Sequence, residues 1–215
     1  MGTITATTII SRVQAELRDD TTFFSESFLL AGLNQAQRAI VLVKPSANTV
    51  SESVALVEGV EQSIPSTGSQ LIDVAYNRGV APGTTMGSDI KLIDKDKLDL
   101  INPTWRSDTA SATVECYMFN PEHPTKFDVY PPQPSSGNGY VWMVYSKPVS
   151  DIADASDVIN LDDIYETPLT QYLHYKARIK DRQFDDALKM YNAFLGSLGQ
   201  KMITEKEFDP DKVLQ

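Results

Sequence analysis

The side chains best suited to acid–base or metal chemistry are few in this sequence, and their spacing does not match that of known metal sites. The chain has two histidines, His123 in an expected turn between strands and His174 in an expected helix. It contains no HExxH motif and no cluster of cysteines and histidines at zinc-binding spacing. We therefore predict that each histidine is satisfied or exposed and that neither binds a metal.

A short acidic run starting at Asp94 has the first three positions of a calcium-binding loop, DKDKLD. Such a loop needs glycine at its sixth position and glutamate at its twelfth, and this chain has Asp99 and Trp105 there. The stretch 94–103 is therefore predicted to be a short, capped surface helix that binds no calcium.

Two pairs of adjacent aspartates, Asp162–Asp163 and Asp185–Asp186, could be imagined as catalytic carboxylates. Adjacent residues point to different sides of a helix, so neither pair converges on one substrate atom. The single cysteine, Cys116, lies in an alternating segment and is predicted to be a buried small hydrophobic residue. The sequence also has no nucleophile elbow, Walker loop or dinucleotide-binding glycine pattern. It therefore predicts a protein that is not an enzyme and has no cofactor.

Four aromatic residues near expected turns could stack on bases or sugars. They are Trp105, Tyr130, Tyr140 and Trp142. Because they have no flanking basic residues, we predict that they pack in a core or at a subunit interface.

The composition is that of an ordinary globular protein, with 215 residues of which 41% are hydrophobic and 22% are charged. This length suits one large or two small domains. A formal net charge of −10 argues against a general nucleic-acid binder, which usually has a basic surface. Around a passage for DNA, an acidic wall would repel phosphates and let the polymer slide. No apolar run approaches the roughly 20 residues that span a bilayer, so we expect no membrane contact.

Helical periodicity marks both ends of the chain. Apolar residues recur at helical spacing over about 7–19, and again from the expected N-cap Ser25 to the next proline. Later, Thr167 and Pro168 fit an N-cap followed by a proline at the first helical position. Another helix is expected over about 184–204. None of these helices has enough apolar surface to be stable alone, so the two pairs are predicted to pack together.

The middle of the chain changes to the alternating pattern of β-strands. The segment SVALVEGVEQSIP predicts a hairpin that turns at Glu58-Gly59. Prolines and a glycine in the stretch 130–137 predict a turn. This pattern favours a small antiparallel sandwich or barrel over alternating strand–helix units. Further strands are expected over 71–75, 90–93, 113–119, 126–130 and 140–145.

The sequence thus predicts an α+β fold in which the N- and C-terminal helix pairs form a four-helix bundle with an inserted antiparallel β-sandwich or barrel. The expected domains are the bundle over 1–46 and 160–206 and the β-domain over 47–150. A linker over 151–159 joins them, and a charged tail over 207–215 follows.

Several strings carry a family resemblance that runs from about Ile9 to Leu198. They are LNQAQRAIVLVKP, SVALVEGVEQSIP, KLIDKDKLDLINPTW, KFDVYPPQP, VWMVYSKPVSDI and LDDIYETPLTQYLHYKARIKD. In their order and spacing they resemble the phage adaptor proteins, which are the head-to-tail connectors of short-tailed bacteriophages.

The resemblance implies a structural virion protein, made in the host cytoplasm and placed at the head–tail interface. It implies a homo-oligomeric ring, usually a dodecamer, beneath the portal protein. Such a ring offers a platform to a distal tail or nozzle protein, and genomic DNA passes through its lumen during ejection. In related adaptors the helical part and the C-terminal extension engage the portal, and the β-domain faces the distal tail. The matching tail here carries Phe208, Val213 and Leu214, which we expect to dock between portal subunits.

Other structural roles remain open at this point. A tail-completion or head-closure protein would share the composition but bind only tail parts. A β-domain that binds a receptor or a carbohydrate would act without any portal. These alternatives differ in partner, and the sequence itself does not name the partner.

Overall fold

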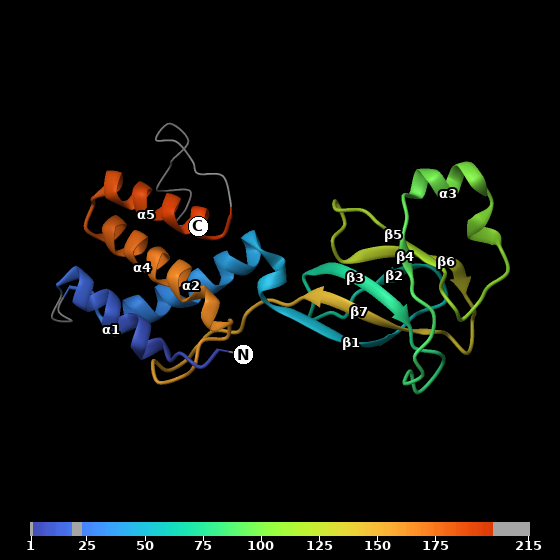
Figure 1. Ribbon diagram of the computed structural model, residues 1–215, viewed down its shortest axis with the longest axis horizontal. Helices are drawn as coiled ribbons and strands as arrows, with labels where there is room; N and C mark the ends of the chain where they lie inside the picture. The colour runs from blue at the N-terminus through green and yellow to red at the C-terminus, as the bar shows by residue number, and fades with distance from the viewer. Residues whose placement is uncertain (1, 19–22, 200–215) are drawn as a thin grey trace. The chain divides into compact units, whose positions relative to one another are not determined.

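The computed structural model describes residues 2–18 and 23–199, which form the predicted α+β fold (Figure 1). The helices are α1 (Ala6–Leu17), α2 (Glu26–Val43), α3 (Lys95–Ile101), α4 (Glu166–Lys180) and α5 (Phe184–Ser197). The strands are β1 (Thr49–Ala55), β2 (Gly59–Ser63), β3 (Gln70–Asn77), β4 (Lys91–Leu92), β5 (Cys116–Phe119), β6 (Lys126–Gln133) and β7 (Tyr140–Ser146). In the described part of the chain these strands form two separate sheets and no closed barrel, so the barrel alternative is wrong.

The chain divides into two compact units, which we call the helical unit and the β unit. The β unit is Asn48–Pro148, and the helical unit is built from the chain before and after it. The domain boundaries drawn from the sequence stay a prediction, because a compact unit need not fold alone. Among the helices described, none is both long and apolar enough to cross a membrane.

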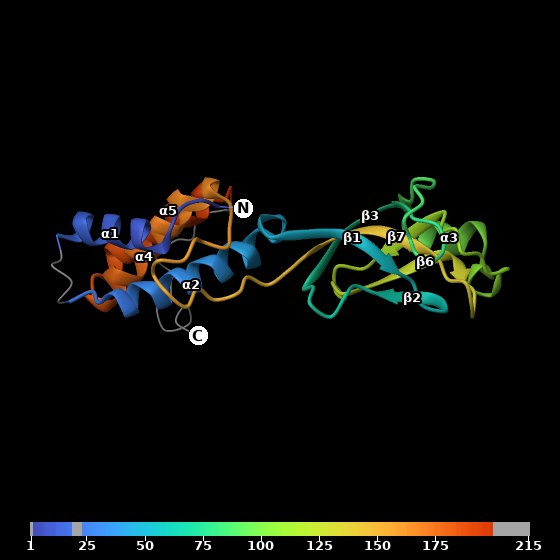
Figure 2. The same cartoon turned by 90° about the horizontal axis from the view of Figure 1, so that it is seen from below.

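Helix α4 is the centre of the helical unit. It contacts α1, α2 and α5, and α5 runs along its side in both views (Figures 1 and 2). Because three helices cover α4, it buries side chains around most of its circumference. These include Leu169, Tyr172, Leu173, Tyr175 and Ala177.

The segment between the β unit and α4 belongs to the helical core. Residues 151–159, where the sequence predicts a linker, bury Ile152, Ala155 and Ile159 there. The side-chain amide of Asn34 in α2 donates to the carbonyl of Ile152 (3.0 Å) and accepts from its N–H (2.8 Å). This polar segment can pack as core because a buried amide satisfies its backbone groups.

Side-chain caps set where the helices begin. As predicted, Ser25 caps α2, and its hydroxyl accepts from the N–H of Phe28 (3.4 Å). The predicted N-cap at Thr167 is wrong, because α4 already starts at Glu166. The 3-10 turn Asp163–Tyr165 leads into α4, and the carboxylate of Asp162 caps that turn.

The two sheets of the β unit share one core. The first has the order β1-β7-β3 and the second β2-β6-β5-β4, and every strand pair is antiparallel except β4 with β5. Residues that alternate along β7 point into the core, because successive side chains of a strand point to opposite faces. Members of this core from both sheets are Val74, Val141, Met143, Tyr145, Tyr117, Phe127 and Val129.

The hairpin predicted at Glu58-Gly59 is wrong. Strand β1 pairs with β7 and β2 pairs with β6, so the turn between them passes from one sheet to the other. The buried amide of Gln62 accepts from the N–H of Val57 and donates to its carbonyl, each at 2.8 Å. The Gln62 side chain therefore makes the hydrogen bonds to the Val57 backbone that a paired strand would make in a hairpin.

Strand β6 also extends through Pro131 and Pro132, where the sequence predicts a turn. Proline lacks an N–H but keeps its carbonyl, and the carbonyl of Pro132 accepts from the N–H of Ser111 (2.9 Å). The strand can therefore continue through Pro132, because the neighbouring Ser111 needs only the carbonyl of Pro132 as an acceptor.

Replacing Asn34 by alanine should lower the free energy of unfolding by about 2–4 kcal/mol, because it leaves two buried backbone groups of Ile152 unsatisfied. Arg38→Ala is the matched control, since Arg38 ties the same helix to the neighbouring Asp151 through an exposed ion pair worth about 0–1 kcal/mol. Urea denaturation measures both changes. Equal losses in the two variants would contradict the proposed role of the buried amide.

Candidate assembly surfaces

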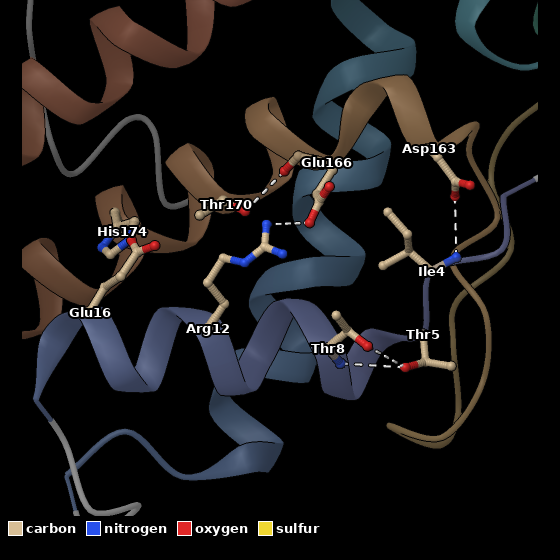
Figure 3. A network of polar contacts seen from close by, with 9 residues as sticks. All are labelled: Ile4, Thr5, Thr8, Arg12, Glu16, Asp163, Glu166, Thr170 and His174. Atoms are coloured by element: carbon tan, nitrogen blue, oxygen red, sulfur yellow. Dashed lines mark hydrogen bonds and ion pairs between the residues drawn. The ribbon is translucent and has the colours of Figure 1, made fainter.

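Polar contacts fasten α1 and the residues before it to α4 and to the turn that precedes α4 (Figure 3). Arg12 forms an ion pair with Glu166, and Glu16 lies 2.6 Å from Nε2 of His174. Asp163 accepts from the N–H and the hydroxyl of Thr3, both at 2.7 Å. These contacts come from segments about 160 residues apart in sequence, so they tie the chain before the β unit to the chain after it.

Neither histidine lies in a reactive arrangement in the described residues. His174 is satisfied by the single carboxylate of Glu16, and His123 is exposed, so both follow the sequence prediction. No group of three or more His, Cys, Asp or Glu side chains in residues 2–18 and 23–199 could hold a metal ion.

The acidic run is the predicted capped helix. Asp94 caps α3 by accepting from the N–H of Asp96 (3.1 Å). Asp99 accepts from the indole N–H of Trp105 (2.7 Å) and from Arg106 (2.9 Å). These bonds, the indole first, hold the pKa of Asp99 below its usual value. The carboxylates of this run are used to position α3 and the turn after it.

The adjacent aspartates have separate structural tasks, as the sequence predicts. Asp162 caps a turn, whereas Asp163 binds the segment before α1. Asp186 pairs with Lys189 (2.8 Å) in the first turns of α5. Cys116 is a buried strand residue, as predicted, and burial raises the pKa of its thiol.

Arginine lies over both tryptophans, which the sequence prediction missed. Trp105 is fully buried, as predicted for core packing, and the guanidinium of Arg106 lies 4.3 Å from its ring centroid. Trp142 stacks on Tyr76 at 6.0 Å, and Arg78 lies 5.2 Å from its ring centroid. The expected absence of basic neighbours is therefore wrong. Arg106 follows Trp105 directly and could have been noticed, whereas only strand pairing brings Arg78 to Trp142.

One cavity of the β unit, which we call the β5–β6 cavity, lies at the turn between β5 and β6 and has a volume of about 230 Å³. The ion pairs Lys95–Asp128 (3.1 Å) and Lys126–Glu61 belong to its lining. Its apolar lining is made of Met118, Phe119 and Phe127. Because these acids and bases neutralise each other, the cavity offers apolar contact and has no unpaired charge among these four residues.

The candidate portal-contact residues lie outside the described residues. They are Phe208, Val213 and Leu214. Their role as a portal contact is a proposal and is taken up below.

Helix capping, core packing and polar contacts between segments involve most of the residues that the sequence offered as candidates for catalysis or metal binding, including His174, Asp99, Asp163 and Cys116. The sequence matches the family model of the SU10 adaptor protein over residues 4–211. Because this match covers nearly the whole chain, the protein belongs to the SU10 adaptor protein family. No curated protein matches the sequence.

Membership confirms the resemblance to phage adaptors. The family is one of structural phage adaptors and is not a class of enzymes. It implies a place in the virion and interaction with phage portal and tail proteins.

Replacing Asp163 by asparagine should make the melting temperature depend less on pH between pH 6 and pH 3. Bonds from Thr3, its hydroxyl first, lower the pKa of Asp163. A lowered pKa gives a stabilisation that is complete above the unfolded value of roughly 4 and is lost as the pH falls through the folded value. Thr3→Ala removes one donor and keeps its N–H, so it should give an intermediate slope. A slope in Asp163→Asn equal to that of the wild type would refute this role.

Proposed function

We propose that this protein is a head-to-tail adaptor that assembles as a ring, with twelve copies, beneath the portal of a tailed phage. The observation that carries the proposal is the family match over residues 4–211. In this role the ring attaches to the portal after genome packaging, presents a platform to a distal tail or nozzle protein, and lets DNA pass through its lumen during ejection. It acts without catalysis.

The helical unit suits the task of a rigid attachment block. We propose that α1, α2, α4 and α5 form a four-helix bundle, supported by their common core. Ion pairs and hydrogen bonds between α1 and α4 join the two ends of the chain. A load on either end would therefore be shared by the whole unit instead of by one helix. We assign portal contact to this unit and distal-tail contact to the β unit.

The charge of the chain suits a DNA passage. A net charge of −10 per copy disfavours binding to phosphates. In a ring, an acidic inner wall would let DNA slide without sticking.

Cryo-electron microscopy of the protein mixed with the portal ring of its own phage tests the proposal first. A second ring stacked on the portal is expected, with its copy number visible directly. A bare portal, under conditions where circular dichroism shows the protein folded, would contradict the adaptor role. Binding to isolated tail parts alone would indicate a tail-completion protein, and binding to cells or glycans would indicate a receptor-binding one.

The C-terminal tail is proposed to anchor the ring through Phe208, Val213 and Leu214. Deletion of all residues after Glu207 should abolish portal attachment and leave the melting temperature of the remaining chain within a few degrees of wild type. A full-length variant with these three residues changed to alanine is the sharper test, because it keeps the length and charge of the tail. Co-sedimentation with the portal measures both variants, and normal attachment by either one would overturn the assignment.

A further inference from the structure

The turn between β6 and β7 contains an Asn-Gly pair, Asn138-Gly139. An asparagine deamidates when the backbone nitrogen of the next residue attacks its side-chain carbonyl carbon. Glycine in the next position favours this attack, because it has no side chain to obstruct the approach of the two groups. Every other asparagine of the sequence is followed by a larger residue, and after Asn102 and Asn120 that residue is proline, which has no N–H to lose. The sequence therefore makes Asn138 the most labile of its asparagines.

Deamidation at this pair consumes only water. The nitrogen of Gly139 loses its proton and forms a bond to Cγ of Asn138, the bond from Cγ to Nδ2 breaks, and ammonia leaves with the proton. The product is a cyclic succinimide. Water then opens the ring to give either aspartate or isoaspartate, in which the backbone runs through the former side chain. The reaction needs no oxidant, reductant or metal.

The fold requires glycine at position 139. A Cβ there would lie 1.9 Å from the carbonyl oxygen of Ala112, so no side chain fits. Gly139 is buried, and its carbonyl accepts from the N–H of Leu56 (3.0 Å). It directly precedes β7, the central strand of the first sheet. An isoaspartate at position 138 would lengthen the backbone just before this strand and disturb its pairing.

Hydrogen bonds hold both reacting groups in an unreactive arrangement. The N–H of Gly139 donates to Oε1 of Gln133 (2.9 Å). The side-chain amide of Asn138 donates to the carbonyl of Pro134 (3.0 Å). Gln133 is 2% exposed, and its Nε2 donates to the carbonyl of Ser111 (2.9 Å), so its acceptor oxygen is fixed in place. Because the nitrogen attacks only after it loses its proton, a buried acceptor on that proton keeps the nucleophile inactive until the turn opens.

We propose that Asn138 is the site at which this chain deamidates, and that Gln133 slows the reaction by holding the Gly139 N–H in the folded turn. The reaction rate of the folded chain is then the rate of the open turn multiplied by the fraction of time that the turn is open. The inference concerns the free chain and does not depend on the proposed function. In the proposed virion role a copy is not replaced after assembly, so slow chemistry here would preserve the pairing of β7.

Peptide mapping by mass spectrometry tests the site and its protection. The full chain is incubated in mildly alkaline buffer, with and without denaturing urea, and each peptide is followed for deamidation and isoaspartate. The peptide that contains Asn138 should react first, and at least about tenfold more slowly in buffer than in urea, because two hydrogen bonds must open before the attack. Asn138→Gln should abolish the change in that peptide, since the longer side chain closes a ring far less readily. Equal rates in buffer and urea, or faster reaction at another asparagine, would overturn the proposal.

A matched pair of variants isolates the part played by Gln133. Gln133→Met keeps an unbranched side chain of similar size and removes the acceptor. It should raise both the hydrogen exchange of the Gly139 amide and the deamidation of Asn138 by a common factor of about ten. Val74→Ala is the control, because Val74 is fully buried in the core of the β unit and makes none of the hydrogen bonds of this turn. It should lower the melting temperature and leave both rates at the wild-type values.

Each outcome decides the role of Gln133. If Gln133→Met speeds exchange at Gly139 and leaves deamidation unchanged, the hydrogen bond does not limit the reaction and the proposal fails. If Val74→Ala speeds deamidation as much as Gln133→Met does, unfolding of the whole β unit controls the reaction and the proposal fails as well. If Gln133→Met does not fold, the comparison of the wild-type chain in buffer and in urea still decides. All of these measurements use the free chain, so their failure leaves the adaptor role standing, and failure of portal attachment leaves this inference standing.

Discussion

The pairing of the first and last strands of the β unit is the constraint on which the rest of the chain depends. Strand β1 runs antiparallel to β7 with Thr49 opposite Ser146. One residue further out, the N–H of Lys147 donates to the carbonyl of Asn48 (2.9 Å), and the Asn48 amide donates back to the carbonyl of Lys147 (2.8 Å). This ladder closes a loop of about 100 residues. It brings together the two parts of the chain from which the helical unit is made. The pairing of β1 with β7 therefore offsets the entropic cost of closing this loop.

Both units are organised around an element that occurs late in its own part of the sequence. In the first sheet β7 lies between β1 and β3, and in the helical unit α4 contacts α1, α2 and α5. Neither element can be fully buried until partners from far upstream are in place. Long-range contacts of this kind favour slow, cooperative formation of the native state. As a result, few elements of each unit can unfold or move independently of the others. This suits a protein that must hold a fixed shape between large partners.

Local patterns were sufficient to predict the class of fold, and pairing was what they could not predict. Helical spacing identified α1 and α2, and the cap at Ser25 was correct because it depends on neighbours only. The hairpin at Glu58-Gly59 failed because alternation says that two strands exist without saying which partners they take. The contacts of the two tryptophans show the same difference between local and long-range information. Asp99 and Trp105 are near in sequence, whereas Arg78 meets Trp142 only through the register of β3 with β7.

Charge and apolar contact act over different distances, and the proposed assembly would use that difference. Copies with a net charge of −10 repel one another at separations up to roughly the 8–10 Å over which salt screens them. Burial of apolar surface between copies gains free energy only at contact. Free copies would therefore meet slowly and in few orientations, because long-range attraction does not steer them. A portal that holds copies side by side removes this barrier, since the cost of bringing like charges together is then met by portal binding. An acidic adaptor would thus form its ring on the template and remain dispersed before reaching it.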